Sequence, residues 1–160
     1  LELQWAGWDP ALGLDNHFLQ RARGRKEIIE LESLELQTSI LLDMPMDVQL
    51  AMLESTLDLA GAADVVASRT WAAMVAGDAE AIPALTAIEN GGVPSPSLEA
   101  FNQRLLGDRN VGMTNRLLHH IKRGSGTWFV IVGAMHVPGE GGILDLLDDH
   151  PFLKVRQVAR

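Results

Sequence analysis

The spacing of apolar positions along the chain predicts helices that alternate with short extended segments. Apolar residues recur every third or fourth position over 13–25, 34–42 and 47–60, which is typical of helices that bury one face. Asp47 suits the beginning of the last of these ranges, and an alanine-rich helix around Trp71, Met74 and Val75 follows it and stops near Gly77. Further helices are predicted over 79–89, 97–122 and 143–149, and a proline- and glycine-rich loop is predicted at 91–96.

Three other segments have the composition of strands: 26–33, 128–132 and 152–158. The run from Trp128 to Val132 is the most apolar, and its β-branched and aromatic residues are typical of a strand buried on both faces of a parallel sheet. The order of elements predicts an α/β fold, a mainly parallel sheet with a large helical insertion between its strands. Because three strands make a thin sheet, we expect an incomplete domain whose remaining strands come from elsewhere.

Length and charge limit what the chain can do. Its 160 residues predict a single domain over 1–160, and the absence of cysteine excludes disulfides and thiolate metal sites. The net charge of −8 argues against nucleic acid or an anionic membrane surface as a partner, because both require clustered cationic side chains. No apolar run is long enough to span a membrane. The chain begins at Leu1 without methionine, which suggests processing or a fragment.

The first candidate for chemistry is His136. The sequence Gly-Ala-Met-His at 133–136 follows the predicted strand at 128–132 and precedes a glycine-rich turn at 138–142. Ligands of open α/β sheets gather at the carboxyl ends of the strands, so His136 lies where such a fold performs chemistry. The alternative is that His136 satisfies backbone groups of the loop.

A second set of candidates lies on the helix predicted at 97–122. Projection at about 100° per residue places Arg109 and Asn110 within the apolar arc of this helix. A buried guanidinium needs a carboxylate partner, and Glu32, at the end of the predicted strand 26–33, can supply it. If both strands are parallel in one sheet, Glu32 and His136 share a rim with Arg109 beside them. The alternatives are that Glu32 is solvated and that Arg109 and Asn110 anchor the helix to a loop.

These residues also carry a family resemblance. Gly-Leu-Asp at 13–15, the segment 29–33 with Gln37, the Arg-Asn pair at 109–110 and the block 132–139 together resemble the TraB/GumN/PrgY family, which is related to the Tiki proteins. The similarity runs from about Gly13 to the C-terminus. The Gly-x-x-His-x-x-Gly block with Arg-Asn one helix upstream is specific in combination, although each piece alone is weak.

The resemblance implies an EreA/ChaN-like α/β fold and a metal-dependent hydrolase or peptidase-like activity. The family carries two Gly-x-x-His motifs and a glutamate; His136 matches the second motif and Glu32 matches the glutamate. The first motif is absent, which implies that the chain is the C-terminal part of such a protein and is not active by itself. By resemblance, His136 and Glu32 are ligands of zinc, manganese or cobalt, or one of them is the base that activates water. Arg109 and Asn110 would orient the glutamate or stabilise an oxyanion.

The resemblance leaves a second function open, a non-catalytic peptide- or ligand-binding regulatory protein of the pheromone-shutdown type. The expected partner under either function is a peptide or a small-molecule substrate. A homo-oligomer that buries an exposed sheet edge is a third expectation. Relatives of the GumN type imply a location in the periplasm or at the cell surface.

Overall fold

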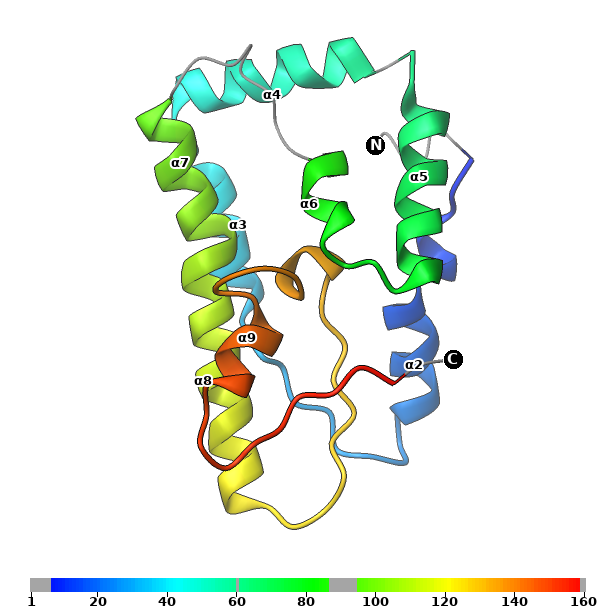
Figure 1. Ribbon diagram of the computed structural model, residues 1–160, viewed down its shortest axis with the longest axis vertical. Helices are drawn as coiled ribbons and strands as arrows, with labels where there is room; N and C mark the ends of the chain where they lie inside the picture. Colours follow the sequence, from blue (N-terminus) through cyan, green and yellow to red (C-terminus); the bar gives the residue numbers. More distant parts are fainter. Residues whose placement is uncertain (1–6, 60, 87–94, 159–160) are drawn as a thin grey trace.

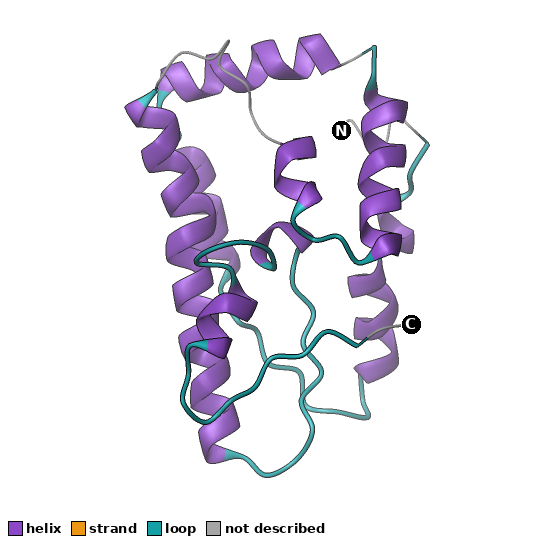
Figure 2. Cartoon of the chain, in the orientation of Figure 1, coloured by secondary structure: helices purple, strands orange, loops and turns teal. Residues whose placement is uncertain are grey.

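The computed structural model describes residues 7–59, 61–86 and 95–158, and its regular elements there are all helical (Figure 2). The α-helices are α2 (Leu14–Ala22), α3 (Leu34–Leu42), α4 (Met46–Leu59), α5 (Ala63–Ala76), α6 (Ala81–Thr86), α7 (Pro96–Asn102), α8 (Asp108–Arg123) and α9 (Ile143–Asp148). Short 3-10 turns lie at η1 (Pro10–Leu12) and η3 (Ala134–His136), and the π-helical stretch η2 (Gln103–Gly107) joins α7 to α8.

The helices form an open frame around irregular segments (Figure 1). α7, η2 and α8 make one long column, with α3 and α9 beside it, and α4 runs across one end of this column. α5 and α2 stand on the opposite side, and α6 lies between the two sides. The extended segments before α3, after α8 and after α9 run through the space between the columns.

The predicted α/β fold is wrong for the described residues, which contain no strand and no sheet. The segments predicted as strands, 26–33, 128–132 and 152–158, lack regular secondary structure over most of their length. Within the described ranges, the backbone hydrogen bonds outside the helices close local turns and caps, and none joins one of these segments to another. β-branched residues favour extended backbone, but a strand also requires a neighbour that completes its ladder of hydrogen bonds.

The prediction that 128–132 is buried on both faces is also wrong. Trp128, Phe129, Val130 and Ile131 are between 40% and 71% exposed. The next residue, Val132, packs against the core. Trp128 and Phe129 make ring contacts with His120 and Phe18, but no second layer covers the segment within the described residues.

The helix predictions agree better with the structure. α3 has the predicted bounds, and the helix predicted at 97–122 is present as α7, η2 and α8. α5 ends at Ala76, and the next residue, Gly77, adopts the left-handed conformation with φ +74°. Ser95 caps α7 through a hydrogen bond to the Leu98 amide, two residues before the predicted boundary. Part of the predicted helix 79–89 and of the predicted loop 91–96 lies outside the described residues.

Two small apolar clusters hold the frame together. The first joins α3, α4 and α7 through Ile40, Val48 and Phe101. The second joins α8 to α9 through Met113, Leu117 and Ile143, and Leu31 and Val132 pack against it. Leu31 directly precedes Glu32, and Val132 lies four residues before His136, so the second cluster draws both extended segments onto α8. No helix in the described ranges combines the length and apolarity needed to cross a bilayer.

Candidate functional site

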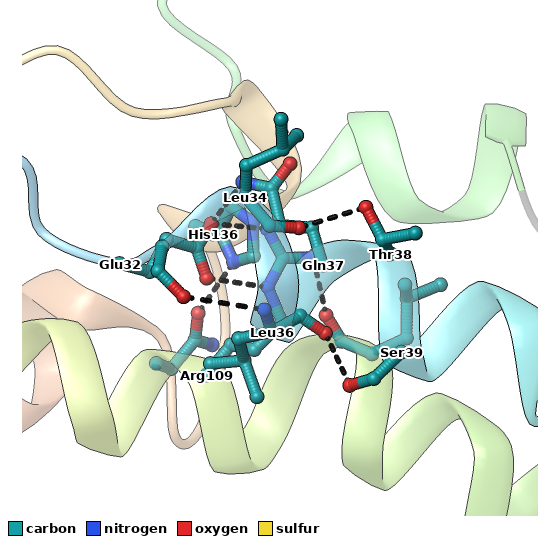
Figure 3. A network of polar contacts seen from close by, with 11 residues as sticks. Glu32, Leu34, Leu36, Gln37, Thr38, Ser39, Arg109 and His136 are labelled. Carbon is teal, nitrogen blue, oxygen red and sulfur yellow. Dashed lines mark hydrogen bonds and ion pairs between the residues drawn. The ribbon is translucent and has the colours of Figure 1, made fainter.

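Glu32 and Arg109 form an ion pair that joins the segment before α3 to α8 (Figure 3). The Arg109 guanidinium donates from Nε to Glu32 Oε2 at 2.8 Å and from Nη2 to Oε1 at 2.5 Å. Each side chain is only 13% exposed, and Arg109 also donates to the Leu105 carbonyl at 2.9 Å. The prediction that the inward guanidinium pairs with Glu32 is confirmed, and the two-pronged geometry fixes both side chains.

Gln37 adds a third donor to the same carboxylate. Its side-chain amide donates to Glu32 Oε1 at 2.6 Å from the first turn of α3, which begins after the Ser33 cap. The hydrogen bonds from Arg109 lower the pKa of Glu32 below its usual value against the opposing effect of burial, and Gln37 and the positive charge of Arg109 lower it further. Glu32 is therefore a stable anion and a weak base.

His136 is oriented by Asn110, the residue that follows Arg109. The Asn110 amide nitrogen donates to the Gly141 carbonyl at 2.9 Å, which leaves its Oδ1 as the acceptor 2.7 Å from His136 Nδ1. Nδ1 must then carry the ring proton, and the neutral imidazole has its lone pair on Nε2. Nε2 makes no hydrogen bond to any of the residues that the structure describes. The arrangement presents one nitrogen of defined protonation.

Burial keeps this imidazole neutral. His136 is 7% exposed and Asn110 is 5% exposed. Desolvation lowers the pKa of His136 below its usual value, the positive charge of Arg109 lowers it further, and the Glu32 carboxylate partly opposes both effects. A neutral imidazole with a free Nε2 can bind a metal ion or accept a proton.

The turn after His136 is built from glycine and held by two carboxylates. Gly139 and Gly141 have φ values of +76° and +73°, a conformation that favours glycine. Glu80 accepts a hydrogen bond from the Gly139 amide at 2.9 Å, and Asp145 accepts one from the Gly141 amide at 2.8 Å. The turn therefore places the Gly141 carbonyl where Asn110 can bind it.

The four residues predicted as a site are brought together without the sheet that was expected to align them. Glu32, Arg109 and His136 gather beside α8 and the start of α3 (Figure 3), and Asn110 joins His136 to the helix. The expected rim of parallel strands is absent from the described residues, and contacts of Leu31 and Val132 with the core replace it. Arg109 binds Glu32, whereas Asn110 binds His136 and does not bind Glu32. The prediction that both residues orient the glutamate therefore holds only for Arg109.

The described residues satisfy only part of the requirements of a metal site. His136 has the arrangement typical of a ligand, since its other nitrogen donates to an oriented acceptor. Glu32 fits less well, because Arg109 and Gln37 already bind both of its oxygens. No group of three histidine, aspartate or glutamate side chains that could hold a metal ion exists in the ranges described above. This part of the chain therefore does not complete a metal site.

Two cavities flank the site. A cavity of about 480 Å³ is lined by Glu32 and Arg109 together with residues of α3 and α8. A larger cavity of about 730 Å³ lies beyond the turn, where Ala134 and Val137 line its wall. His136 lies between Ala134 and Val137 in the sequence, but its side chain lines neither cavity.

A comparison with known protein families identifies the family of the chain. The model of the TraB/PrgY/gumN family matches residues 1–154. The chain belongs to the TraB/PrgY/gumN family. No curated protein and no solved structure matches it. The match includes Glu32, Arg109, Asn110 and His136, so the four candidate residues of this TraB/PrgY/gumN domain all lie within the family region.

Sequence reasoning missed the side chains that support these four residues. Gln37 was part of the family resemblance, but its bond to Glu32 was not predicted. Glu80 gave no signal, because it is 59 residues from Gly139 and only the fold brings the two together. Asp145 is four residues after Gly141 in the first turn of α9, a local contact that was also missed. A glycine-rich turn needs acceptors for its amides, and that requirement was the one available indication of such carboxylates.

Proposed function

We propose that this chain contributes part of a metal-dependent hydrolase or peptidase-like site, to which His136 supplies its Nε2 atom. The observation that carries the proposal is the contact of 2.7 Å between Asn110 Oδ1 and His136 Nδ1, which leaves Nε2 without the ring proton, and burial lowers the pKa of the ring. Hydrolysis of a peptide bond needs a group that either binds a metal or takes a proton from water, and a neutral Nε2 does either.

The other residues act through position and charge. Asn110 is a positioning residue, because its amide is committed to His136 and Gly141 and is not available to an oxyanion. Arg109 is committed to Glu32 and Leu105 through three donors, and Glu32 is too weak a base to activate water. A divalent metal, when bound, would polarise the scissile carbonyl and lower the pKa of water. His136 would supply one ligand, and the described residues do not supply the full set.

The decisive experiment is cleavage of an unstructured, fluorescence-quenched peptide by the protein with zinc, manganese or cobalt. We expect metal-dependent cleavage that falls by about a hundredfold or more in His136→Gln, the scale of a lost general base or ligand. His119→Gln is the matched control, because His119 is an exposed histidine on α8. Equal cleavage by wild type and His136→Gln would refute the proposal.

Metal binding gives a second readout that does not depend on turnover. Calorimetric titration of the protein with zinc should show weak binding that His136→Ala abolishes. Equal zinc affinity in the wild type and in His136→Ala would remove His136 as a ligand and leave only its role as a base.

One observation favours a binding function without catalysis. The Glu32 carboxylate is held by three hydrogen bonds beside a cavity of about 480 Å³, an arrangement that suits a rigid wall for a ligand as well as it suits chemistry. A peptide- or ligand-binding regulatory protein would retain the peptide stoichiometrically and release it uncleaved. Mass spectrometry of the bound peptide after incubation separates the two functions.

A further inference from the structure

Glu80 binds the glycine turn after His136 from a distant part of the chain. Its Oε1 accepts a hydrogen bond from the Gly139 amide at 2.9 Å, across 59 residues of sequence. The other two contacts that hold the turn come from closer residues, since Asp145 is four residues after Gly141 and Asn110 is 31 residues before it. Asn110 and Asp145 belong to α8 and α9, whereas Glu80 lies between α5 and α6. Glu80 therefore ties the turn to a different part of the helical frame.

The turn at 138–142 depends on these outside contacts for its shape. Three of its five residues are glycine. Within the turn, the described residues form a single backbone hydrogen bond, from the Gly142 amide to the Gly139 carbonyl at 3.0 Å. Glycine has more conformational freedom than any other residue, so a turn of this composition keeps one shape only when contacts from outside restrain it. Loss of one such contact should let the turn adopt other shapes.

The loop that carries Glu80 is itself held at both ends. It begins at Gly77, whose carbonyl accepts a hydrogen bond from the Gln157 side chain at 3.0 Å. At its other end, Asp78 Oδ1 accepts from the Ala81 amide at 3.3 Å, where α6 begins. These contacts fix the backbone on either side of Glu80, so its carboxylate reaches Gly139 from a loop of defined shape.

We propose that Glu80 is a positioning residue for His136 and acts on it through the glycine turn. The bond from Gly139 to Glu80 holds the turn, and the turn sets the place of the Gly141 carbonyl. That carbonyl accepts from the Asn110 amide nitrogen, which leaves the amide oxygen facing His136 Nδ1. The inference rests on the proposed function and makes it more specific, because a remote carboxylate then decides whether Nε2 is free of the ring proton.

Long-range ¹H–¹⁵N NMR of the His136 ring tests the inference without any substrate. In Glu80→Ala the turn is released, so the Asn110 amide can rotate and present its nitrogen to the ring. The ratio of the Nδ1–H to the Nε2–H tautomer should then fall by about threefold to tenfold, the scale of one lost hydrogen bond. Glu80→Gln keeps an acceptor oxygen for the Gly139 amide and should restore the ratio of the wild type.

Glu140→Ala is the matched control. Glu140 is an exposed carboxylate within the same turn, and the described residues give it no hydrogen bond or ion pair, so its removal should leave the ratio unchanged. Hydrogen exchange of the Gly139 amide checks the first contact, and this exchange should be faster in Glu80→Ala alone. An unchanged ratio or unchanged exchange in Glu80→Ala, or an equal effect of Glu80→Gln or Glu140→Ala, would overturn the inference. Circular dichroism checks that each variant is helical.

The two proposals fail separately. Cleavage that depends on His136, in a protein whose ring tautomer is the same with and without Glu80, would leave the proposed function standing and remove this inference. A tautomer ratio that depends on Glu80, in a protein that releases every peptide uncleaved, would do the reverse.

Discussion

Asn110 Oδ1 lies 2.7 Å from His136 Nδ1, and the nitrogen of the same amide donates to the Gly141 carbonyl at 2.9 Å. Rotation of the amide by 180° would place its oxygen against the Gly141 carbonyl oxygen, a repulsive contact, so one carbonyl in a glycine turn determines which imidazole nitrogen carries a proton. The backbone of the turn and the side chain of His136 are thereby parts of one unit.

Replacement of Asn110 by aspartate should raise the pKa of His136. A carboxylate beside Nδ1 favours the charged imidazolium, and it removes the donor that binds Gly141. Long-range ¹H–¹⁵N NMR reads both the tautomer and the titration of the ring. We expect the Nδ1–H tautomer in the wild type and a titration displaced to higher pH in Asn110→Asp. Asn115→Asp, an exposed position on α8, should leave the titration of His136 unmoved.

Removing one member of the Glu32 and Arg109 pair should be costly. Arg109→Met leaves a partly buried carboxylate without its main partner, and we expect the free energy of unfolding to fall by about 2–4 kcal/mol. Glu32→Met should cost a similar amount, and the double variant should cost clearly less than the sum of the two. Urea denaturation of the three variants gives the coupling energy.

The pair formed by Arg104 and Asp43 is the control for this cycle. Its members are 3.7 Å apart and their side chains are 44% and 68% exposed, so its coupling should be about 0–1 kcal/mol. Additive effects at Glu32 and Arg109 would show that the two-pronged contact contributes no more than this surface pair.

The stability of the fold should decline as the pH falls from 7.5 to 5. The pKa of His136 is lowered in the folded protein, so the unfolded chain binds a proton first as the pH passes the ordinary value of 6.5. The lowered pKa of Glu32 acts in a separate window, since its contribution is lost only as the pH falls below 4.5. Urea denaturation at several pH values should give a shallower slope above pH 5 for His136→Asn than for the wild type. If the free energy of unfolding has the same pH dependence in both proteins, His136 has the same pKa in the folded and the unfolded chain.

The sequence predicted an inward Arg109 that needs a carboxylate, because helical periodicity placed the guanidinium on the apolar arc of its helix and a buried charge needs a partner. Glu32 was the candidate because of its place at the end of a predicted strand, and the pairing is present although the strand is not. It was not sufficient for the sheet. The run from Trp128 to Val132 favours extended backbone, but strand pairing is a property of two segments, and a pattern within one segment does not show whether a partner exists.

The division of labour between Arg109 and Asn110 also lay beyond the sequence. Consecutive helical residues point about 100° apart, which allows two inward side chains to reach different partners. Which partner each one meets depends on Leu31 and Val132, the contacts that set how the extended segments lie on α8. Periodicity predicts that a residue points inward, but which residue it contacts depends on how the segments pack.

Leu31 should therefore matter to the site as well as to stability. It packs against Met113, Leu117 and Ile143 directly before Glu32, and its truncation in Leu31→Ala should lower the free energy of unfolding by about 1–2 kcal/mol, since it is only partly buried. Leu34→Ala is the matched control: Leu34 is 74% exposed, and its loss should cost less than about 0.5 kcal/mol. In the Leu31 variant the Arg109 Nε–H resonance should also move or broaden, because Glu32 loses the anchor that holds it against α8. A destabilised Leu31→Ala protein with an unchanged Arg109 resonance would show that the ion pair positions the segment without help from the core.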